Sequence, residues 1–145
     1  MPDSMLLGIE EQVLSLEVDE NPADNFPCMP CLGVHAEMRT QLYATLMGVF
    51  YDEAESMEQL ALEYGPYGPY VFKLDYTITE RLAEIEEDDI PGLARIWAES
   101  ADMSALNLAD EDLQDVLASF LFNLIHFCML VRQQPVLSVF IFSDG

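Results

Sequence analysis

Basic residues are scarce in this chain of 145 residues. It has five lysines and arginines and two histidines against 27 aspartates and glutamates, which gives a formal charge of −22. A small domain usually carries a net charge of about 2 to 8 in magnitude, so self-repulsion opposes both folding and self-association here. A surface of this sign repels phosphate groups. We therefore expect no nucleic acid and no membrane as partner, but a protein with a basic surface.

Sequence motifs for catalysis and nucleotide binding are also lacking. The chain has no P-loop, no G-x-S-x-G, no H-E-x-x-H and no dinucleotide-binding glycine pattern. Among so many carboxylates, no pair stands out as a general acid and base, and few cations are left to bind phosphate or carboxylate substrates. We therefore predict a non-catalytic protein without a cofactor, with an enzyme of unknown class as a less favoured alternative.

Cysteines are too few to cross-link a domain of this size, and their number, three, is odd. The first residues, Met1–Ser4, lack the positive charge of a secretory signal. Together these features indicate a reducing, cytoplasmic location.

The motif Cys28-Met29-Pro30-Cys31 is the one short pattern that suggests chemistry. With His35 it supplies three zinc ligands, and Cys128 or His126 is available as the fourth, but a second paired half-site is missing. A thioredoxin-type site is disfavoured because no strand precedes the motif and nearby acids raise a thiol pKa. We favour two partly buried thiols in a proline-shaped turn, and keep a small Cys/His zinc-binding protein as an alternative.

No apolar run reaches the roughly 18 to 20 residues that a membrane-spanning helix needs. The longest, Val116–Val131, instead predicts a buried helix over Leu108–Gln134, capped by Asn107 and ended by Pro135. Its polar interruptions fall at helical spacing and are expected at a helix–helix contact; they are Ser119, Asn123 and His126.

Two apolar stripes follow this predicted helix, which indicates packing on more than one side. One stripe comprises Leu113, Leu117, Phe120, Leu121, Leu124, Cys128 and Val131, and the other Phe122, Ile125 and Met129. The second stripe offers a dimer contact, but the charge opposes it, so we favour a monomer over a homodimer.

The remaining pattern predicts an α+β fold. Alternating apolar residues predict strands at Val13–Asp19 and Tyr70–Tyr76, and a run dense in β-branched and aromatic residues predicts a buried strand at Val136–Phe142. Three prolines within eleven residues predict a loop over Asn21–Cys31. Two helices are expected within Ala36–Tyr64, separated near Gly48, with a strand through Leu42–Tyr51 as the alternative for the first. A short helix capped by Thr77 or Thr79 follows, and another opens at Pro91. Residues 1–145 are thus expected to form a single, predominantly helical domain, in which a long buried C-terminal helix packs with shorter helices and a small, about three-stranded sheet.

Acidic residues concentrate on both sides of Pro91. We predict that they bind the partner; they are Glu80, Glu84, Glu86, Glu87, Asp88, Asp89, Asp110, Glu111, Asp112 and Asp115. The favoured function is an acidic protein-binding module, such as an immunity-type protein that neutralises a basic toxin or effector. The alternative is an inhibitor that imitates DNA, because carboxylates one helical turn apart match the scale of backbone phosphates.

Overall fold

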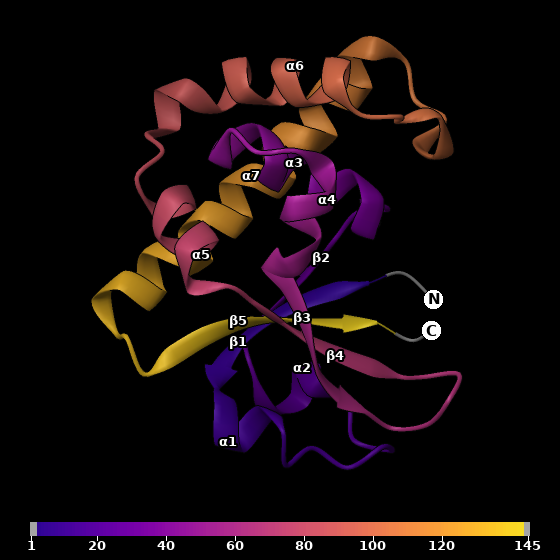
Figure 1. The fold of residues 1–145 in the computed structure, drawn as a ribbon, viewed down its shortest axis with the longest axis vertical. Coiled ribbons are helices and arrows are strands. Elements are labelled where there is room, and N and C mark those ends of the chain that lie inside the picture. The colour runs from indigo at the N-terminus through magenta and orange to yellow at the C-terminus, as the bar shows by residue number, and fades with distance from the viewer. Residues whose placement is uncertain (1–2, 144–145) are drawn as a thin grey trace.

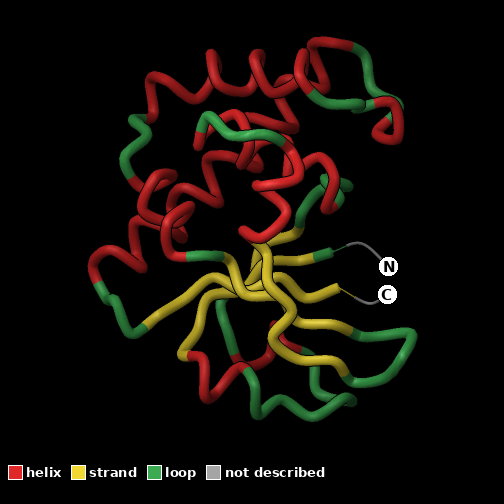
Figure 2. Tube along the Cα trace, in the orientation of Figure 1, coloured by secondary structure: helices red, strands yellow, loops and turns green. Residues whose placement is uncertain are grey.

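The computed structural model describes residues 3–143, which form one five-stranded antiparallel sheet and seven α-helices (Figures 1 and 2). The strands are β1 (Ser4–Ile9), β2 (Cys28–Pro30), β3 (Glu58–Glu63), β4 (Tyr70–Leu74) and β5 (Leu137–Ser143). The helices are α1 (Glu10–Val13), α2 (Pro22–Asn25), α3 (Ala36–Met47), α4 (Tyr51–Ala54), α5 (Tyr76–Ala83), α6 (Ile90–Ser100) and α7 (Asp110–Gln133). Three short 3₁₀ turns complete the fold, namely η1 (Glu55–Met57), η2 (Glu87–Asp89) and η3 (Ser104–Leu106).

The sheet order is β2-β1-β5-β4-β3, so the two terminal strands lie side by side at its centre. Helices α3, α5 and α7 cover one face of the sheet, and α6 packs on the outside of this helical layer. Helices α1 and α2 lie on the opposite face of the sheet (Figure 1). Helix accounts for 54% of the chain and strand for 19%, so helix predominates. The predicted sheet of about three strands is nevertheless wrong, because β1, β2 and β3 were not expected.

Side chains on the central strands alternate between two apolar cores. Met5 and Leu7 of β1 point into the larger core under the helices, whereas Leu6 points into the smaller one with Phe140 of β5. A side chain at Gly8 would collide with the ring of Phe26, since a Cβ there would lie 2.7 Å from it. The absence of a side chain at this position lets the loop before β2 close over the second face.

Strand β1 escaped prediction because it is buried on both faces. Its residues Met5–Leu7 form a continuous apolar run, which lacks the period of two that marks a half-buried strand. The strand predicted at Val13–Asp19 is wrong: Val13 ends α1, and Val18 is 61% exposed in the following turn. The predicted loop Asn21–Cys31 also contains regular structure, namely α2 and β2.

The helix expected near Met57–Tyr64 is wrong, because Glu58–Glu63 of this segment form β3. The register with β4 shifts between Leu60 and Leu62, which is a β-bulge that leaves Ala61 unpaired. The extra residue breaks the two-residue alternation and gives apolar spacings of three and four, which resemble a helix. The preceding helix α3 does end at the expected break, because Gly48 adopts φ 67° in the left-handed region.

The predicted helix caps are wrong. Asn107 has φ 50° and lies in the turn before α7, whose N-cap is Ala109 without a side-chain bond. Helix α5 is capped by Asp75, which accepts from the backbone N–H of Thr77 at 2.8 Å.

The first predicted apolar stripe of α7, from Leu113 to Val131, faces the core, as predicted. All of its members are buried except Leu113, which is half-buried. Helix α7 packs against α5, α6 and β5. By length and composition alone, α7 could also cross a membrane, a criterion that the core helix of a globular protein meets as well. The stripe Ser119, Asn123 and His126 faces outward, because all three are exposed. The expected polar helix–helix contact is therefore wrong.

Candidate functional site

The structure separates the predicted partner-binding acids into two groups. Asp110, Glu111, Asp112 and Asp115 occupy the first turns of α7. The residues from Glu80 to Asp89 lie on α5, on η2 and in the turn between them. Glu80 and Glu84 lie 3.6 and 3.9 Å from Arg132 near the end of α7, and Glu86 and Glu87 line a hollow together with Phe122 and Met129 of α7. Since α7 has 24 residues and rises about 1.5 Å per residue, the groups lie toward opposite ends of a rod about 36 Å long. They do not form one continuous patch.

A cleft of about 530 Å³ opens between α7 and the segment that connects α5 to α6. Four residues of α7 line one side, namely Phe122, Ile125, His126 and Met129. The opposite side carries apolar Ala83, Ile85 and Ile90 and acidic Glu84, Glu86 and Glu87. The cleft therefore combines the second predicted stripe of α7 with three of the predicted acids.

Phe122, Ile125 and Met129 of α7 form the floor of the cleft, which is apolar and open to solvent. Ile125 is buried, but Phe122 and Met129 are 48% and 43% exposed, although both belong to a helix that packs in the core. The ring of Phe122 stacks on His126 with centroids 6.5 Å apart and an interplanar angle of 19°. An exposed apolar floor inside a polar rim is a common feature of protein interaction sites.

The acidic side of the cleft retains most of its charge. Glu84 lies 3.8 Å from Arg81 and 3.9 Å from Arg132, but these pairs are exposed and long, so they stabilise little. Among residues 3–143, Glu86 and Glu87 form no ion pair. Two carboxylates beside the apolar floor are thus available to a cationic group.

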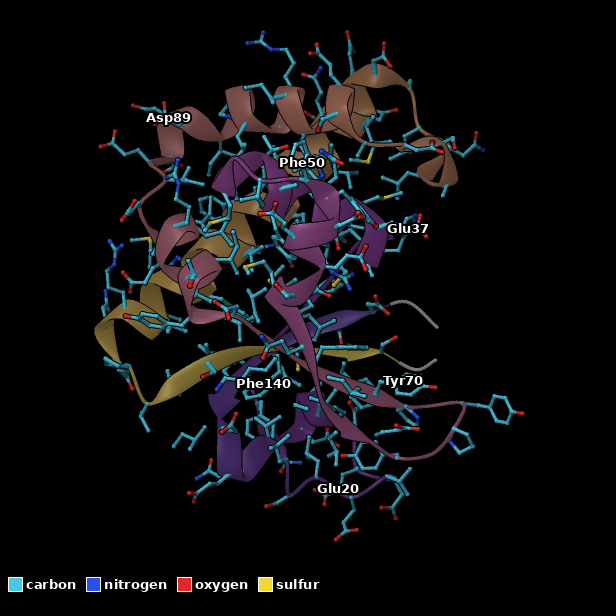
Figure 3. All side chains as sticks on the ribbon, viewed as in Figure 1. Glu20, Glu37, Phe50, Tyr70, Asp89 and Phe140 are labelled. Carbon is cyan, nitrogen blue, oxygen red and sulfur yellow. The ribbon has the colours of Figure 1, made fainter. Side chains whose placement is uncertain are left out.

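Carboxylates also occur on other sides of the molecule. Figure 3 labels three of them: Glu20 on the side of α1 and α2, Glu37 on α3, and Asp89 at the start of α6. The hollow that Glu20 borders has a comparable volume, about 560 Å³, but its apolar residues are only Leu16 and Phe26. The larger hollow that Glu37 borders has about 440 Å³, and its aromatic residues, Tyr51, Tyr70 and Phe72, are all partly buried. The α5–α7 cleft is distinguished by its exposed apolar floor rather than by charge alone.

A polar cluster around Arg39 is buried, and no local sequence pattern indicates it. Arg39 of α3 is 1% exposed and donates to both carboxylate oxygens of Glu58 at 2.8 and 3.0 Å, and to Asp3 at 2.9 Å. It also donates to the carbonyl of Val34 at 2.8 Å, and Tyr43 donates to Glu58. Because Arg39 of α3 bonds to Glu58 of β3 and to Asp3, the cluster fixes α3 to β3 and to the residue before β1.

The pKa values in this cluster follow from burial and the Arg39–Glu58 pair. Burial alone lowers the pKa of Arg39, but its hydrogen bonds to Glu58 and the charge of Glu58 raise it above the ordinary value. Burial and then the charge of Glu58 raise the pKa of Tyr43. Near pH 7 the arginine therefore stays charged and the tyrosine neutral, so neither Arg39 nor Tyr43 is a general base or a nucleophile at that pH.

The structure does not assemble the candidate zinc site. Among residues 3–143, no group of three or more His, Cys, Asp or Glu side chains is placed to hold a metal ion, so Cys28, Cys31 and His35 do not converge. Cys28 lies on β2 and is partly buried, while Cys31 and Cys128 are fully buried. Burial raises the pKa of both Cys31 and Cys128 to about 12, which disfavours the thiolate that zinc requires.

Comparison of the chain with protein-family models, curated protein sequences and solved structures finds no match.

Proposed function

We propose that this chain is an acidic, non-catalytic protein-binding module that captures a basic partner protein at the cleft between α5–η2 and α7. An immunity-type protein, which neutralises a toxin or effector by covering its basic surface, is the most specific form of this proposal. The observation that carries it is the juxtaposition of an exposed apolar floor, Phe122 and Met129, with unpaired Glu86 and Glu87.

Each half of the cleft has a separate role in this proposal. The net charge of −22 attracts a basic protein before contact, and this attraction extends about 10 Å at 0.1 M salt. Complementary charge mainly accelerates association and disfavours wrong partners, whereas a few well-buried side chains supply most of the binding energy at a protein interface. An acidic wall beside an apolar floor therefore selects a partner that is both basic and apolar at the contact.

Charge-matched variants test the proposal. Glu84→Gln, Glu86→Gln and Glu87→Gln together neutralise the cleft, while Asp110→Asn, Glu111→Gln and Asp112→Asn remove the same charge at the start of α7. Each tagged protein is incubated with an extract of its own cells at low salt. We expect the wild type and the α7 variant to retain the same basic protein and the cleft variant to lose it.

Two results would contradict the proposal. One is that no basic protein is retained at about 50 mM salt, where electrostatic attraction is weakly screened. The other is equal retention by both triple variants, which would show that total charge matters and the cleft does not.

The DNA-mimic alternative remains a prediction, and the same experiment separates it. A mimic occupies the DNA-binding surface of its partner, so double-stranded DNA added to the complex would displace it in competition. A partner that DNA does not release, and that depends on the cleft acids, favours capture at the cleft.

A further inference from the structure

The cleft also indicates the shape of what it binds, because its floor has a helical repeat. Phe122, Ile125 and Met129 follow one face of α7 at spacings of three and four residues. From Phe122 to Met129 this face extends about 10 Å, at about 1.5 Å per residue. Side chains from two turns of a partner helix, at positions i, i+3 or i+4, and i+7, match that length.

A partner strand does not fit this surface. The floor of the cleft is a helix, and the opposite wall is the turn between α5 and α6, so the cleft presents no strand edge. A strand laid against these apolar side chains would leave its own backbone N–H and C=O groups without partners. A helix satisfies its backbone internally and can bury an apolar face against Phe122, Ile125 and Met129.

The two sides of the cleft differ in charge, so a bound helix would have one preferred orientation about its own axis. All three carboxylates that line the cleft, Glu84, Glu86 and Glu87, come from the α5–η2 side, whereas the residues that α7 contributes to the lining include no carboxylate. A helix in the cleft therefore meets carboxylates along one border of its apolar stripe only. Lysine or arginine is favoured on that border and neutral residues on the other.

A second copy of this chain is a poor occupant. Two copies would bring the same three glutamates toward one another around the apolar contact, in a particle that already carries a formal charge of −22 from each chain. Charge complementarity thus favours a cationic helix over self-association.

We propose that the cleft binds an amphipathic helix of the partner, with an apolar stripe that inserts against Phe122 and Met129 and basic residues along the border that faces Glu86 and Glu87. This inference rests on the proposed function and adds the conformation and chemistry of the bound segment. The flexible side chain of Met129 allows the floor to adapt to different apolar side chains.

Two peptide pools of identical composition provide the test. Each peptide has about 15 residues, long enough for a marginally stable helix. The apolar positions vary among Leu, Ile and Phe, and the basic positions are Lys. In the first pool the apolar residues follow the helical repeat with Lys on one border; in the second they alternate with Lys every second residue, as in a strand. Retention on the immobilised protein is quantified by mass spectrometry.

Matched variants identify the surface that is used. Phe122→Ser with Met129→Ser removes the exposed floor, and Ile96→Ser with Leu108→Ser removes equally exposed apolar residues elsewhere. Because all four positions are solvent-accessible, we expect both variants to keep the fold, and the emission of the buried Trp97 checks this. We expect the helical pool to be retained about tenfold more than the alternating pool, and to lose that preference only in the Phe122/Met129 variant.

The inference is overturned if the two pools are retained equally, if neither is retained, or if the Ile96/Leu108 variant loses as much as the Phe122/Met129 variant. These failures are distinguishable from failure of the proposed function. A cellular partner that still depends on Glu84, Glu86 and Glu87 would leave capture at the cleft standing, with a segment of another conformation.

Discussion

Replacement of Arg39 by methionine is the most informative test of the fold. The side chain of Arg39 is 2% exposed, and its ion pair with Glu58 is largely buried, since the side chain of Glu58 is 9% exposed. Arg39→Met keeps the apolar length of the side chain but leaves Glu58 and Asp3 without their cation and the carbonyl of Val34 without this donor. Loss of one partner of a buried ion pair costs about 3–5 kcal/mol, because the other charge remains desolvated.

This loss is a large fraction of the total stability, which is about 5–15 kcal/mol for a protein of this kind. We expect the melting temperature to fall by roughly 10 °C, given a shift of about 3 °C per kcal/mol at this size. Urea unfolding followed by circular dichroism and by emission of the single tryptophan, Trp97, measures the free energy directly.

The matched control is Arg95→Met on the exposed face of α6. It removes the same charge and so increases the overall repulsion equally, but we expect it to change the unfolding free energy by no more than about 0.5 kcal/mol. A difference of less than about 1 kcal/mol between the two variants would refute the reasoning. The double variant Arg39→Met/Glu58→Leu should recover part of the loss, because it removes the unpaired carboxylate together with its cation.

Three further predictions follow from burial. Iodoacetamide should modify Cys28 first, and Cys31 and Cys128 only on unfolding; modification of all three at one rate would contradict their burial. Stability should decrease as the pH rises from about 9 toward 12, because burial raises the pKa of Cys31 and Cys128 to about 12, so that the unfolded chain loses these protons first; a constant urea midpoint would contradict this. Trp97→Phe should cost about 1–3 kcal/mol in urea unfolding, because it removes the 2.8 Å hydrogen bond to the carbonyl of Met38; an unchanged midpoint would show that this bond is dispensable.

The helical layer of the fold was largely predictable. The stripe from Leu117 to Val131 has a strong period, and Gly48 and Pro91 mark helix boundaries through their own backbone preferences, which tertiary contacts do not alter. Strand β4 was predicted because its apolar residues alternate with others, and β5 because it is rich in β-branched and aromatic residues.

The sheet was less predictable because its missed strands lack a simple period. Strand β1 is apolar on both faces, β2 has three residues around prolines, and β3 contains a bulge. The Arg39 cluster depends on contacts between residues far apart in sequence, such as Arg39 and Glu58, which local patterns do not encode. For the cleft, the sequence provided the stripe Phe122, Ile125 and Met129 and the acids, but not their juxtaposition.

The most direct test of capture at the cleft is the methyl NMR spectrum of protein labelled at its eight methionines, recorded with and without the partner recovered in the charge-variant experiment. Met129 lies in the cleft and is 43% exposed, whereas Met5 and Met38 are buried in the core. Substitution of Met129 by leucine assigns its signal. We predict that the partner shifts or broadens the Met129 signal and leaves those of Met5 and Met38 in place; an unchanged Met129 signal in the fully formed complex would contradict binding at the cleft.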